Sequence, residues 1–179
     1  SPLFDRIWRN RYYYDRFGIY IDVCILSSIE VAMASLAKTK PANFRIIAEE
    51  LEDLDFDTIH YILIRGYAAN GEQFVDDAVN YLIKYPVCLE TGYVEDEFKA
   101  ATELLEAITP YCSNEQLDKI ESNIVGNYPN IEDHEKAQFK LYNGIDSSRR
   151  SESVINRLKE LEKKFGQSLE EPPRTFSVG

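Results

Sequence analysis

Three aspartates at alternate positions, Asp53, Asp55 and Asp57, form the pattern in this sequence that most resembles a metal site. Calcium loops use side-chain oxygens at this spacing, but they need glycine at the sixth position and glutamate at the twelfth. Thr58 and Ile64 stand at those positions here. We therefore expect solvated acids at the start of a helix, where the macrodipole favours negative charge.

Histidines and cysteines do not form a recognisable reactive site. His60 and His134 are far apart and lie outside any HExxH pattern, and zinc needs three or four converging ligands. Cys24, Cys88 and Cys112 have no CxxC spacing, which is typical of reduced, buried thiols in a cytosolic protein. Neither GxxxxGK[ST] nor GxGxxG occurs. The sequence predicts a non-enzymatic protein without a metal or a cofactor.

Arginines alternate with aromatic residues near the N-terminus, where Arg9 and Arg11 are followed by Tyr12 and Tyr13. Guanidinium groups stack on aromatic rings and pair with phosphates or carboxylates, so these four residues are candidates for binding a partner. The alternative is a helix that docks on its neighbour, with buried aromatics and with arginines that neutralise acids elsewhere in the chain. We favour docking.

Arg149 and Arg150 form a second basic cluster, just before the last expected helix. Such a pair is able to hold an acidic or phosphorylated partner through charge-assisted hydrogen bonds. We favour pairing with nearby acids of the same chain, and retain both arginines as candidate partner-binding residues.

Charge is distributed unevenly along the 179 residues, which carry a formal net charge of −11. Residues 1–40 contain six basic and four acidic side chains, residues 41–135 contain five and 21, and residues 136–179 contain nine and six. The acidic middle argues against a nucleic-acid interface, because such interfaces attract phosphates with basic side chains. With 44% hydrophobic residues, the chain is expected to fold rather than remain disordered.

Apolar residues recur at helical spacing through most of the chain, so we predict an all-α fold. A weak internal repeat has a constant offset of 43 residues: Glu72-Gln73 matches Glu115-Gln116, and Tyr85-Pro86 matches Tyr128-Pro129. This spacing is typical of HEAT-like arrays of helical hairpins. We predict antiparallel hairpins stacked as a short HEAT-like α-solenoid, with a compact orthogonal helical bundle as the alternative.

One structural unit is expected, with N-terminal helices over 1–40, a helical-repeat domain over 41–165 and a proline-containing tail or linker over 166–179. The apolar stretch 19–37 carries two acids, which disfavour a membrane span. The chain begins with Ser1 and has one interior methionine, so we expect a processed chain or a piece of a longer protein.

Five sequence segments resemble the helical C-terminal region of large bacterial STAND-type NTPases, the class that includes the AVAST antiviral proteins. These segments are residues 58–74, 104–110, 144–152, 157–166 and 171–174. The resemblance implies a much longer parent chain, with an ATP-binding module upstream and this segment within a ligand-sensing repeat array. It transfers no nucleotide-site residue, because the phosphate loop does not occur here.

We therefore expect a cytoplasmic, non-enzymatic helical-repeat segment that recognises a protein partner within a larger ATP-binding signal-transduction protein of antiviral defence. Oligomerisation through the parent chain is compatible with this reading, whereas membrane and nucleic-acid partners are disfavoured. The alternative is a stand-alone acidic adaptor that binds a basic partner protein, with association steered by charge.

Overall fold

The computed structural model describes residues 21–54, 56–92 and 97–165. Within these ranges the chain forms helices and no strand, so the predicted all-α class is confirmed. The α-helices are α1 (Ile21–Thr39), α2 (Pro41–Leu51), α3 (Asp57–Ala69), α4 (Val75–Lys84), α5 (Lys99–Ile108), α6 (Asn114–Asn127), α7 (Glu135–Gly144) and α8 (Glu152–Phe165). Short 3₁₀ turns follow α4, α5 and α6: η1 (Pro86–Glu90), η2 (Thr109–Tyr111) and η3 (Glu132–His134).

Local sequence signals set several helix ends. Ser113 caps α6 in a capping box, in which its hydroxyl accepts from the Gln116 amide and the Gln116 side chain accepts from the Ser113 amide. Helices α4 and α6 both end before a Tyr-Pro pair, and Tyr85 and Tyr128 have the same backbone angles, φ −125° and ψ 75°. Proline disfavours the helical conformation in the residue before it. The two ends related by the offset of 43 residues therefore have matching geometry.

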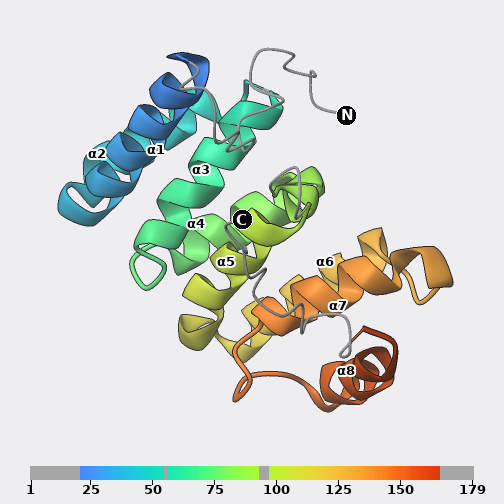
Figure 1. Cartoon of the computed structure of the whole chain (residues 1–179). Coiled ribbons are helices and arrows are strands. Elements are labelled where there is room, and N and C mark those ends of the chain that lie inside the picture. The colour runs from blue at the N-terminus through green and yellow to red at the C-terminus, as the bar shows by residue number, and fades with distance from the viewer. Residues whose placement is uncertain (1–20, 55, 93–96, 166–179) are drawn as a thin grey trace, which may run out of the picture.

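The helices follow one another across the molecule in chain order, from α1 and α2 at one end to α8 at the other (Figure 1). Helices α1, α3, α5 and α7 pack successively against one another, and we call them the odd row. Helices α2, α4 and α6 form the even row, in which α4 packs on α6 and the ion pair between Arg45 and Asp77 joins α2 to α4. Each helical hairpin thus packs against the next one along the chain.

Hydrogen bonds between neighbouring hairpins repeatedly join residues separated by similar lengths of chain. Arg45 and Asp77 are 32 positions apart, Asn70 and Ala37 are 33 apart, and Asn123 and Leu82 are 41 apart. These contacts join helical hairpins that are consecutive along the chain.

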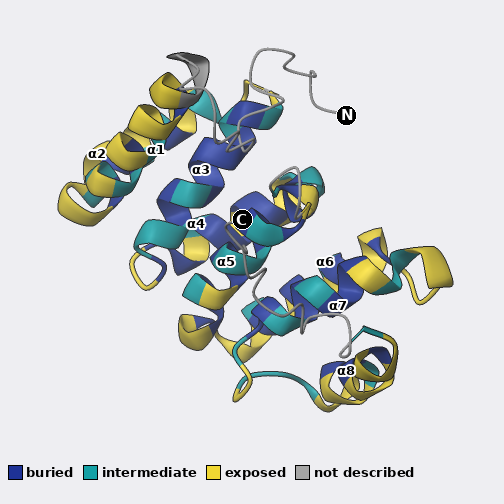
Figure 2. Cartoon of the chain, in the orientation of Figure 1, coloured by how far each residue is buried: buried dark blue, intermediate teal, exposed yellow. Residues whose placement is uncertain are grey.

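An aromatic core fills the space between α2, α3 and α4. Phe44 is fully buried and lies 5.3 Å from Tyr67 and 4.9 Å from Phe74, measured between ring centroids. Complete burial of one such ring contributes about 1.5–3 kcal/mol. The inward faces are buried throughout the stack, while α2 and α8 expose wide outer faces (Figure 2). No helix in the described ranges is long and apolar enough to span a bilayer.

Candidate functional site

Arg149 and Arg150 bind backbone carbonyls of their own chain. Arg149 Nη2 donates to the carbonyl of Cys112 at 2.7 Å and to Asn114 Oδ1 at 3.3 Å. Arg150 donates from Nε to the carbonyl of Ile145 at 2.9 Å and from Nη2 to that of Asn143 at 3.0 Å. The carbonyls of Asn143 and Ile145 lie at the C-terminal end of α7, where a cation is favourable, whereas the Cys112 carbonyl lies just before α6. The arginines therefore anchor the segment between α7 and α8 through backbone oxygens. Their charges also act on the nearby Asp146, whose pKa is lowered chiefly by hydrogen bonds from Ser148 and further by Arg150 and Arg149.

The other candidate partner-binding residues, Arg9, Arg11, Tyr12 and Tyr13, lie outside the described residues.

The expected solvated acids lie at the start of α3, and His60 lies inside the same helix. Asp53 is exposed and lies 3.8 Å from Lys84 Nζ, and Asp57 is the first residue of α3. His60 is buried, and its Nδ1 lies 2.6 Å from the Tyr81 hydroxyl. Among residues 21–54, 56–92 and 97–165, no three His, Cys, Asp or Glu side chains converge as metal ligands.

The three cysteines differ sharply in accessibility. Cys24 is exposed on α1, whereas Cys88 and Cys112 are buried. Burial raises the pKa of the Cys112 thiol to about 11, which suppresses the reactive thiolate at neutral pH.

We predict that a thiol reagent added to the native protein at neutral pH modifies Cys24 rapidly and the other two thiols only on unfolding. Ellman's reagent measures this directly, with the chain in denaturant as the control for total thiol. Rapid modification of Cys112 in the native protein would contradict the burial described above.

Acidic charge is concentrated on one row of helices. The even row contains seven acidic and three basic residues, whereas the odd row contains six and five. The three basic residues of the even row already form ion pairs: Arg45 with Asp77 at 2.8 Å, Lys84 with Glu52 at 2.8 Å, and Lys119 with Glu115 at 2.6 Å. The remaining carboxylates give this row a net negative surface.

A groove of about 620 Å³ lies between α4 and α6, and we call it the α4–α6 groove. It is open to solvent along most of its extent, so it is a shallow surface groove rather than an enclosed ligand pocket. Polar residue types predominate in the lining, but most of the surface they expose in the groove is carbon, and they come from both helices: Asn80, Ile83, Glu115, Asp118, Lys119, Ser122 and Asn123.

Two hydrogen bonds hold the helices beside this groove. Gln116 Nε2 donates to Asp76 Oδ1 at 2.6 Å near the start of both helices. Asn123 Nδ2 donates to the carbonyl of Leu82 at 3.0 Å further along. Because the bonded positions advance along both helices together, α4 and α6 run parallel.

Charge in the groove is predominantly negative. A hydrogen bond from Lys119 lowers the pKa of Glu115, so this carboxyl is ionised at neutral pH and neutralises the lysine. Asp118, exposed on the same helix, adds a further negative charge. Ile83 contributes an apolar surface that is 41% exposed. The groove is thus suited to a cation with an apolar stem.

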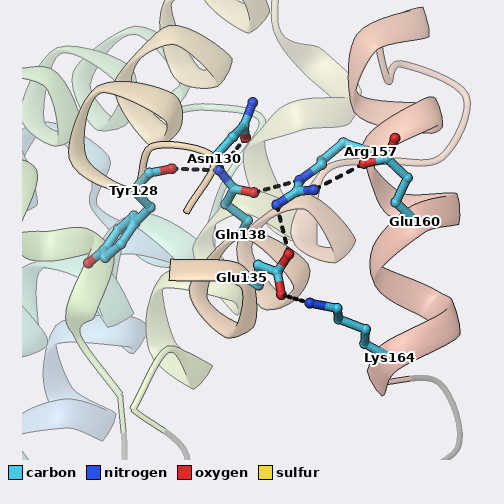
Figure 3. Close-up of polar contacts among 7 residues, drawn as sticks. All are labelled: Tyr128, Asn130, Glu135, Gln138, Arg157, Glu160 and Lys164. Carbon is cyan, nitrogen blue, oxygen red and sulfur yellow. Dashed lines mark hydrogen bonds and ion pairs between the residues drawn. The ribbon is translucent and has the colours of Figure 1, made fainter. Parts of the chain in front are cut away.

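A second polar cluster joins α6, α7 and α8 (Figure 3). Gln138 is fully buried; its Nε2 donates to the Tyr128 carbonyl at 2.6 Å, and its Oε1 accepts from Arg157 Nε at 2.9 Å. Glu135 accepts from Lys164 at 2.7 Å, which is the main reason that its pKa is lowered, and it also pairs with Arg157. This cluster holds α8 on the stack.

Sequence reasoning missed the α4–α6 groove as a site. The repeat did contain a signal, because Asn80 and Asn123 are equivalent positions at the offset of 43 residues and both line the groove. The spacing between two helices, however, depends on tertiary packing.

Comparison of the chain with protein-family models, with curated proteins and with solved structures gives no match.

Proposed function

We propose that this chain is a non-enzymatic helical-repeat segment that recognises a protein partner through the even row. The observation that carries the proposal is the acidic surplus of this row, whose own cations are already paired, together with the α4–α6 groove on the same row. Unbalanced surface charge steers a partner of opposite sign and selects against partners of the same sign.

The stacked contacts support a short HEAT-like solenoid as the architecture in our proposal. Successive packing of α1, α3, α5 and α7 and parallel pairing of α4 with α6 are the contacts that such an array requires. An array of this kind offers an extended surface for a protein partner.

For the wider context, we propose a larger bacterial, cytoplasmic, ATP-binding signal-transduction protein of the STAND type, acting in antiviral defence. Support for this context comes from the sequence resemblance over 58–74, 104–110 and 144–152. The segment described here would sense the ligand, and a nucleotide module elsewhere in the parent chain would respond.

The second candidate function is a stand-alone acidic adaptor for a basic partner protein. The same charge surplus favours it, and its partner chemistry is the same. Genomic context separates the two proposals: a reading frame that extends upstream of Ser1 to a phosphate-binding loop favours the sensor, and an initiator methionine directly before Ser1 favours the adaptor.

Selection of random peptides displayed on phage tests protein recognition without assuming a partner. We expect enrichment of peptides with spaced basic residues on the wild-type chain. Binding should weaken about tenfold in the variant Glu50→Gln/Asp118→Asn, which removes two exposed carboxylates of the even row. The matched control Glu106→Gln/Glu162→Gln removes two exposed carboxylates from α5 and α8 and should bind normally. No enrichment, or equal losses in both variants, would refute the proposal.

A further inference from the structure

We propose that the α4–α6 groove binds an arginine side chain from an extended segment of the partner protein. This inference rests on the proposed function and specifies what the even row recognises. The groove is lined by residues of two helices and has a volume of about 620 Å³. Hydrogen bonds join these two helices beside it.

Charge excludes an anionic occupant. The ammonium of Lys119 lies 2.6 Å from Glu115 Oε1, so the groove's own cation is neutralised within the chain. Asp118 then leaves the lining with a net negative charge. The other helices of the even row add to this field, because Arg45 and Lys84 are paired as well. A cation gains from this field, whereas a phosphate or carboxylate is repelled.

The lining also distinguishes an extended cationic segment from an apolar helix. Ile83 is the apolar member of the lining, and it offers a surface for the aliphatic stem of a long side chain. Asp118 supplies a carboxylate that a planar guanidinium can engage with two parallel hydrogen bonds. Asn80 and Ser122 offer neutral donors and acceptors for a peptide backbone. An amphipathic helix would need a continuous apolar stripe instead.

NMR titration of the ¹⁵N-labelled chain tests the site even when binding is weak. The probe is a serine-glycine peptide that contains arginine, and the comparison peptides carry lysine or glutamine at the same positions. We expect shift changes concentrated on α4 and α6 for the arginine peptide, smaller changes at the same residues for lysine, and none for glutamine. Equal responses to arginine and glutamine would overturn the proposal.

Variants separate the groove from the general acidic field. Asp118→Asn should weaken binding of the arginine peptide about fivefold, while Glu106→Gln, an exposed acid on α5, should change it less than about twofold. Ile83→Ala should weaken binding about threefold, and Val125→Ala, an exposed residue on α6 outside the lining, should leave it unchanged.

The variants test the arginine site, and the phage selection tests protein recognition by the even row. Equal losses for Asp118→Asn and Glu106→Gln, or shifts spread over both rows, overturn the arginine site but leave protein recognition through the even row in place. Failure of protein recognition itself shows in the phage selection as the lack of any enriched peptide.

Discussion

Gly71→Ala is expected to destabilise the protein by about 2–4 kcal/mol, because the turn between α3 and α4 packs directly on α5. A Cβ at Gly71 would lie 2.5 Å from the carbonyl carbon of Ala107 and closer still to its oxygen. Backbone atoms of a helix cannot move aside as a flexible side chain does, so the whole turn must shift. None of the described glycines has a positive φ, and the cost is therefore steric.

The shift would affect more than one contact. Asn70, next to Gly71, donates to the carbonyl of Ala37 near the end of α1 at 2.9 Å. One turn thus contacts both α1 and α5, and moving it should loosen three consecutive hairpins. Because the turn is fixed on both sides, this single methyl group is costly.

Gly126→Ala is the matched control for this substitution. No atom lies within 4 Å of the position of its Cβ, and the residue is exposed within α6. Alanine is a better helix former than glycine, so the variant should be about 0.5–1 kcal/mol more stable. Urea unfolding followed by circular dichroism measures both changes, and a Gly71→Ala protein as stable as the wild type would contradict the close packing of the turn.

Gln138→Leu is expected to cost about 2–4 kcal/mol and to loosen α8. Leucine has nearly the right size but cannot accept from Arg157 or donate to the carbonyl of Tyr128. Each buried group left without its partner costs about 1–3 kcal/mol. The Gln138 amide is therefore the centre of the contacts that hold α8 (Figure 3).

Glu160→Gln provides the control, because Glu160 pairs with the same arginine but its side chain is 66% exposed. Loss of an exposed ion pair should cost less than about 1 kcal/mol. Hydrogen exchange of the α8 amides, together with urea unfolding, separates loosening of this helix from global destabilisation. Equal behaviour of Gln138→Leu and Glu160→Gln would show that the buried amide has no special role.

Local signals explain why much of the fold was predictable. The Ser113 capping box, the Tyr-Pro stops at Tyr85 and Tyr128 and the first-turn proline Pro41 act through backbone geometry within a few residues. Their positions therefore appear directly in the sequence. The sequence pattern placed His60 in a helix but did not decide between the surface and an interface, and the structure buries it beside Tyr81.

Contacts between distant residues explain what was missed. The sequence placed Arg149 and Arg150 near acids of the same chain, and both act on Asp146, but it did not indicate that the carbonyls of Cys112 and Ile145 accept their hydrogen bonds. Which carbonyls remain open depends on how the hairpins stack. The α4–α6 groove also depends on tertiary packing, because its lining residues come from two helices that come together only when the chain folds.

The measurement that most directly tests protein recognition by the even row is the affinity of the strongest phage-selected peptide as a function of salt. We predict that the dissociation constant rises at least about tenfold between about 50 mM and about 300 mM salt, and that Glu50→Gln/Asp118→Asn removes most of this dependence. An affinity indifferent to salt and unchanged in that variant would contradict recognition by the acidic row.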